Sequence, residues 1–290
     1  VDEGYVPPIP DAGTPSPDAG AVAPVDAGPS EPALLFVAVG GDDKGPGTAE
    51  PPLASIGEAL VRAALTSGVP EVRVCTGTYL EAPITITKDV RLLGSYACPS
   101  WNRELNFSHP SYGLWPATEI SCNQPSDQAA ATLTLLGTGV TSNTIVEGVS
   151  VFAPENGGAR STGRGILVAD GASPRLLHLG VAGGHQMLAA PGFPGSVSID
   201  IVDSSPTVRH TAVCGGSGFV DGTWQPASVG VWVHGNSSPD IAQDNLSGCA
   251  GQALWIRTGA WELNVASVGL WWQSTGIATE SAGNPISQIF

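Results

Sequence analysis

The sequence predicts an all-β protein whose main domain is a parallel β-helix, a solenoid built from coils about 23 residues long. Three observations lead to this fold class. Charged residues make up only 13% of the 290 residues, which is too few to cover long exposed helices. The chain contains 38 glycines and 25 prolines, which suit a fold with many turns. A short pattern of alternating apolar residues also recurs along the C-terminal half.

The first 33 residues differ in composition from the rest of the chain. They contain eight prolines, six acidic side chains and no basic ones, and Asp-Ala-Gly occurs three times. Such a segment cannot build an apolar core, so we expect an extended tail or linker over residues 1–33 and the β-helix over residues 34–290. The tail resembles those that follow the lipid-attachment signal of bacterial surface lipoproteins. This implies an extracellular or bacterial cell-surface protein.

One helix is expected, over about residues 55–67. Ser55 and Glu58 have the spacing of a capping box, Ile56 and Leu60 share a face, and Gly68 provides the stop. A helix at this place would cover the first coil of the solenoid, which otherwise exposes its core and unpaired backbone. It would therefore act as an N-terminal cap.

Four apolar columns define the repeat in the C-terminal half. Corners such as Ser173-Pro174 follow the first two columns, and two longer gaps match insertions near residues 184–195 and 216–227. Strands this short bury their apolar sides only by stacking about 4.8 Å apart, and the coils of one solenoid run parallel. An antiparallel β-sandwich is the alternative. The columns are Ile166, Ile199, Val231, Leu254 and Ile277; Val168, Ile201, Val233, Ile256 and Thr279; Leu176, Val208 and Ile241; and Val181, Val213 and Leu246.

The N-terminal half also has strand-like runs, at residues 72–74, 84–87, 91–94, 132–136 and 145–152. Residues 35–60, with Gly41-Asp42 and Gly45-Pro46-Gly47-Thr48, resemble the opening of pectin-lyase-like proteins. Residues 75–81 and 92–98 resemble the next two segments of that superfamily. The likeness covers residues 34–290 and implies a right-handed parallel β-helix. It implies no particular activity, because the superfamily includes lyases, hydrolases, epimerases, adhesins and inactive surface proteins.

Tryptophans form a candidate ligand-binding column. Trp232 and Trp255 each stand between two column residues, so both should face outward in line with Asp200. Exposed aromatic rings one strand apart suit stacking on sugars. The alternative is that the inserted loops cover the column and bury it.

A catalytic site is a weaker interpretation. Lyases of the resembled superfamily use calcium-binding carboxylates and a Lys or Arg base on an outer face. Here Arg209 and Arg257 are the plausible bases, and Asp200 and Asp203 are the nearest carboxylates. The adjacent pair Asp42-Asp43 is interpreted instead as part of a turn.

The cysteines and histidines suggest contacts between coils. Cys75 and Cys98 are one coil length apart, and Cys214 and Cys249 follow equivalent strands, so either pair could form a disulfide or remain as buried thiols. Cys122 is left over. His178 and His210 each lie five or six residues after a corner begins and should stack in a polar ladder. No Cys/His spacing indicates a metal site, so calcium is at most a weak possibility and no other cofactor is expected.

The net charge of −15 opposes binding to nucleic acid or to an anionic membrane, and no apolar stretch is long enough to span a membrane. The chain stops just after a corner, with Ile286, Ile289 and Phe290 in its last residues. An open last coil would expose these residues to another copy, so head-to-tail assembly through this end and the tail is one hypothesis.

The function expected from the sequence is that of a non-catalytic extracellular β-helix with a structural, adhesive or self-assembling role. The alternatives are a polysaccharide-binding module that uses the tryptophan column and a polysaccharide lyase or hydrolase. Neither the ligand nor the oligomeric state follows from the sequence.

Overall fold

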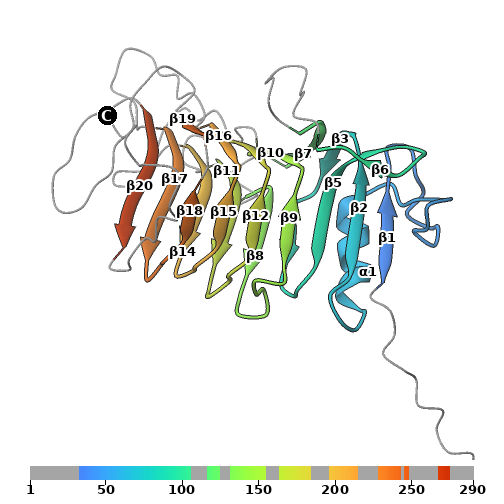
Figure 1. The fold of residues 1–290 in the computed structure, drawn as a ribbon, viewed down its shortest axis with the longest axis horizontal. Helices are drawn as coiled ribbons and strands as arrows, with labels where there is room; N and C mark the ends of the chain where they lie inside the picture. The colour runs from blue at the N-terminus through green and yellow to red at the C-terminus, as the bar shows by residue number, and fades with distance from the viewer. Residues whose placement is uncertain are drawn as a thin grey trace, which may run out of the picture. The chain divides into compact units, whose positions relative to one another are not determined.

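The computed structural model describes residues 33–105, 116–124, 131–154, 163–183, 196–214, 228–242, 245–247 and 267–274. Within these residues the strands coil into a solenoid whose turns each contribute one strand to each of three parallel sheets (Figure 1). The predicted parallel β-helix is confirmed, and the antiparallel sandwich is excluded because strand pairing is parallel throughout the three sheets except between β5 and β6. The predicted tail, apart from Ala33, lies outside the described residues.

The first sheet has the order β1 (Leu34–Val37), β2 (Glu71–Cys75), β5 (Arg91–Ala97), β9 (Ile145–Glu147), β12 (Arg175–Leu177), β15 (Thr207–Arg209) and β18 (Asp240–Ala242), with β6 (Asn102–Arg103) on β5. The second contains β3 (Gly77–Glu81), β7 (Thr118–Cys122), β10 (Ser150–Phe152), β13 (Gly180–Ala182), β16 (Ala212–Cys214) and β19 (Asn245–Ser247). The third contains β4 (Ile84–Ile86), β8 (Leu133–Leu136), β11 (Gly163–Ala169), β14 (Ser196–Val202), β17 (Ser228–Gly235) and β20 (Ser267–Ser274).

The apolar columns pair in the predicted register over three turns. Ile166 lies beside Ile199, which lies beside Val231, and all three side chains are fully buried. The columns through Leu176 and Val181 are confirmed in the same way by the pairings of β12, β15 and β18 and of β13, β16 and β19. Like residues therefore stack along the inside of the solenoid and form its continuous core.

The predicted continuation of the first column is wrong. The residue beside Val231 is Leu270 of β20, where the sequence interpretation had placed Leu254. Residues 254–256 and 277–279 lie outside the described residues. The turn after β17 is therefore longer than the 23-residue repeat that was assumed.

A left-handed residue marks the corner between the first and second sheets. The predicted run over residues 145–152 is divided there into β9 and β10, because Gly148 has φ +70°. His178 and His210 occupy the same corner in the next two turns, with φ of +51° and +52°. This corner turns the chain from the first sheet into the second.

The expected cap is present as α1 (Ile56–Ala64), which packs against β1, β2 and β3. Ser55 Oγ accepts the backbone N–H of Glu58 at 3.3 Å, as in a capping box, but Glu58 pairs with Arg62 and the N–H of Ser55 goes to Asp43. The predicted turn role of Asp43 is thus confirmed. The helix ends earlier than residue 67, and the Lys88 ammonium donates to the carbonyl of Ala64 at 2.9 Å.

Asp89 ties two turns together at a corner near the cap. Its carboxylate accepts the backbone N–H and the hydroxyl of Thr141, the hydroxyl of Thr144 and the amide of Asn143. Burial by itself raises the pKa of Asp89, but these donors outweigh it and hold the pKa below its ordinary value.

An Asp89→Asn variant should lose about 1–2 kcal/mol of free energy of unfolding at neutral pH, because an amide cannot accept all four donors. A carboxyl with a lowered pKa in the folded state stabilises the protein above its unfolded pKa, and this contribution is lost as pH falls through the folded value. The difference between wild type and variant should therefore shrink below about pH 4. Urea unfolding at several pH values measures it, and a difference that persists undiminished in acid contradicts the assignment.

Candidate functional site

Arginines gather on the outer face of the first sheet. Val72, Leu92, Val146, Leu176 and Val208 are fully buried, so their strand neighbours point outward. The outward positions include four arginines, and β6 adds a fifth by folding back onto β5. We call this surface the arginine face; its basic residues are Arg73, Arg91, Arg103, Arg175 and Arg209.

Two of these arginines are available to a ligand. Arg91 pairs in register with Ile145, which pairs with Arg175, so the two arginines lie two strands apart in one column, about 10 Å. Both are exposed. Within the described part of the chain, neither guanidinium has an ion-pair partner.

The other three arginines of the face are held by acidic or aromatic neighbours. Arg73 pairs with Glu71 at 2.7 Å, Arg103 with Glu147 at 2.8 Å, and Arg209 with Asp240. These contacts fix the guanidinium groups in place.

An aromatic cluster lies beneath the arginines at the capped end of the face. The Arg73 guanidinium lies 5.5 Å from the ring centroid of Tyr96 and 5.7 Å from that of Phe36, and Arg103 lies 5.7 Å from Tyr96. Trp101, which is partly exposed, packs edge-on against Phe36 with ring centroids 4.6 Å apart. The face therefore combines fixed cations with a partly exposed aromatic ring.

The predicted histidine ladder is confirmed at the edge of the arginine face. The rings of His178 and His210 are stacked with centroids 4.8 Å apart and planes within 9°. His178 Nδ1 lies 3.0 Å from Glu147 Oε1, so the ladder contacts the same carboxylate that holds Arg103.

The predicted outer column on the third sheet exists, but it does not expose an aromatic surface. Asp200 lies between Leu167 and Trp232 in register, and the next residue is Trp271, where Trp255 was expected. Trp232 is only 4% exposed. The interpretation that it stacks on sugars from the surface is therefore wrong for the described structure, and the alternative of a covered column holds for Trp232. Trp255 lies outside the described residues.

Asp200 is the centre of a buried polar cluster on this sheet. Its side chain is 1% exposed, and it binds Arg164 Nε through one oxygen and His234 Nε2 through the other, at 2.8 Å. The His234 ring stacks on Trp232 with centroids 4.0 Å apart. Sequence reasoning selected Asp200 but missed Arg164 and His234, which lie on the neighbouring turns.

The weaker catalytic set is not brought together. Asp200 lies on the third sheet and Arg209 on the first, where it pairs with Asp240. Asp203 lies at the corner after β14, where it accepts the backbone N–H of Asn236 at 2.7 Å. Arg257, together with the predicted assembly residues Ile286, Ile289 and Phe290, lies outside the described residues.

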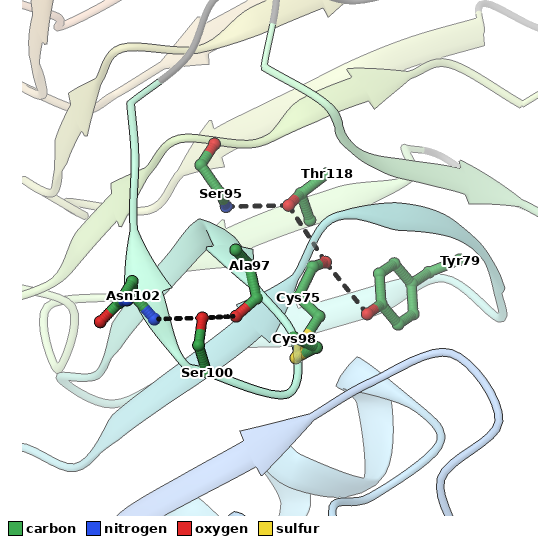
Figure 2. Close-up of a disulfide and its surroundings, with 8 residues drawn as sticks. All are labelled: Cys75, Tyr79, Ser95, Ala97, Cys98, Ser100, Asn102 and Thr118. Atoms are coloured by element: carbon green, nitrogen blue, oxygen red, sulfur yellow. Dashed lines mark hydrogen bonds between the residues drawn. A yellow bond between two sulfur atoms is a disulfide. The ribbon is translucent and has the colours of Figure 1, made fainter.

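Cys75 and Cys98 form the first predicted disulfide, with Cα atoms 5.8 Å apart (Figure 2). The carbonyl of Cys75 accepts the hydroxyls of Tyr79 and Thr118, so the half-cystine is fixed on both sides. Cys214 is also in a disulfide; its expected partner, Cys249, lies outside the described residues. Cys122 is a free, buried thiol, and burial raises its pKa.

In the described ranges, no three His, Cys, Asp or Glu side chains gather to hold a metal ion. No helix among the described residues is long and apolar enough to cross a membrane.

Residues 39–178 match the family described as "Protein of unknown function (DUF1565)". The chain has the pectin-lyase-like β-helix fold. Similar solved structures are a pectin methylesterase from carrot (14% identity, TM-score 0.36, 88% of this chain and 66% of that one) and a pectin methylesterase from Aspergillus niger (14% identity, TM-score 0.39, 88% and 91%). The chain thus spans just under two thirds of the carrot protein. No curated protein sequence gives a significant match.

Proposed function

We propose that this protein is a non-catalytic extracellular β-helix that adheres to anionic polysaccharide through its arginine face. The observation that supports the proposal most directly is the column of exposed arginines formed by Arg91 and Arg175. The proposal keeps the adhesive role expected from the sequence but moves the binding surface from the third sheet to the first.

The charge distribution favours an anionic ligand. The chain has 26 acidic and 11 basic side chains, yet five of those basic residues lie on one face of one sheet. The acidic residues of that face, Glu71, Glu147 and Asp240, are each paired with an arginine. At physiological salt the Debye length is about 8 Å, so the negative charge elsewhere on the protein is largely screened from a ligand on this face.

The arrangement of the face favours an extended polymer. Arg91 and Arg175 repeat along the stacking direction, so a linear chain that runs across the strands meets successive guanidinium groups. Each planar guanidinium offers paired N–H donors to a carboxylate or sulfate. Trp101 adds a ring against which a sugar can stack.

The disulfides support an extracellular location. Such bonds persist in oxidising compartments and are rare in reducing ones, and Cys75 and Cys98 are joined between adjacent turns. An adhesive surface protein would work in that environment.

An Arg91→Gln, Arg175→Gln double variant should bind dextran sulfate at least tenfold more weakly than wild type, because two charged contacts of about 1 kcal/mol each are removed. Isothermal titration calorimetry at low salt, with uncharged dextran as the reference polymer, measures the effect. The matched control is Lys44→Gln, Lys88→Gln, which removes the same charge from exposed positions outside the face. Equal weakening in the two double variants, or no binding by wild type, would refute the proposal.

A further inference from the structure

We propose that the stacked His178–His210 pair makes the arginine face bind polyanions more tightly as pH falls. This inference rests on the proposed function and adds a regulatory element to the same surface. It starts from the corner between the first and second sheets, where the two rings stack 4.8 Å apart.

The backbone of this corner does not require histidine. It requires a residue in the left-handed region, and Gly148 meets that requirement one turn earlier with φ +70°. In the next two turns the same position is His178 and then His210. Both are residues with a bulky ring, so they contribute a side chain that the corner itself does not need.

The surroundings of the pair are suited to a positive charge. His178 Nδ1 lies 3.0 Å from Glu147 Oε1, so a protonated ring forms an ion pair with that carboxylate. Arg103 shares Glu147 through its other oxygen, 2.8 Å away, and opposes the added charge. Asp240 and Arg209 form their own pair on the neighbouring strands β18 and β15, and Arg175 on β12 is exposed.

Protonation changes the charge of the face where a ligand would meet it. Imidazoles ordinarily gain a proton between about pH 8 and pH 5. His210 is exposed, and both rings follow strands that carry arginines of the face, β12 and β15. Each proton therefore adds a cation beside Arg175 and Arg209 without any movement of the backbone.

The experiment measures binding of dextran sulfate, whose sulfate esters keep their charge, at about pH 7.5 and about pH 5.5. Wild type should bind about fivefold to tenfold more tightly at the lower pH. The His178→Asn, His210→Asn variant should bind like wild type at the higher pH and show no more than a twofold change at the lower pH. Asn is chosen because it tolerates the left-handed backbone. The matched control is His234→Gln, which removes a histidine of the third sheet and still donates to Asp200.

The outcomes separate the inference from the proposed function. Binding that is lost in the Arg91/Arg175 variant but independent of pH in wild type overturns the inference and leaves the proposed function standing. A pH dependence that survives in the double histidine variant, or that disappears in the His234 control, also overturns it. Absence of binding at both pH values overturns both.

Discussion

Replacing Asp200 by Asn is expected to lower the free energy of unfolding by about 3 kcal/mol, because it breaks a buried ion pair. The carboxylate is 1% exposed and serves Arg164 and His234 at the same time. An amide offers one acceptor oxygen and turns an N–H₂ group toward the second donor. The guanidinium of Arg164 then remains largely buried without a counter-charge.

Urea unfolding followed by tryptophan fluorescence measures this loss, and Asp170→Asn is the matched control. Asp170 lies at an exposed corner after β11 with φ +57°, a conformation that Asn also tolerates. The same chemical change there should alter stability by no more than about 0.5 kcal/mol. Equal effects at positions 170 and 200 would show that the buried cluster contributes little.

A Cys75→Ser, Cys98→Ser variant is expected to lose about 3 kcal/mol of stability. The disulfide closes a loop with a sequence separation of 23 residues, and its removal returns the corresponding chain entropy to the unfolded state. The hydroxyls of Tyr79 and Thr118 would still reach the backbone of residue 75, so the local fold should persist (Figure 2). The loss should appear as a lower unfolding midpoint.

The substitution is preferable to reduction of wild type, because a reductant would also break the disulfide of Cys214. Cys122→Ser is the control, since it replaces a free thiol and opens no loop. If the single and double variants unfold at the same urea concentration, the disulfide does not constrain the unfolded chain as assumed.

The architecture could be predicted because the apolar columns report directly on stacking. Ile166, Ile199 and Val231 are separated by nearly constant intervals, and only stacked coils bury such a series. The prediction failed at Leu254 because a fixed period was assumed. A better signal was present, since Ser228-Val229-Gly230 recurs as Ser267-Val268-Gly269, and these segments pair residue by residue.

The candidate surfaces were less predictable. Alternation shows that Trp232 points out of the core, but it does not show whether other parts of the protein cover that side chain, which is 4% exposed. The arginine face was missed because its members are spread from Arg73 to Arg209 and come together only through strand register. Arg103 enters through the antiparallel strand β6, which interrupts the repeat. Side-chain pairing across turns requires the register, and a single sequence fixes it only where columns are long.

The left-handed corner has a consequence for how such a chain can change in length. Five residues separate Val146 from Val151, and the same interval separates Leu176 from Val181 and Val208 from Val213. From the second sheet to the third, the interval is 15 residues in one turn and 18 in each of the next two, yet the strands stay in register. Additional segments can therefore be accommodated at that edge without disturbing the scaffold, whereas a single inserted residue at the histidine corner would displace every strand that follows.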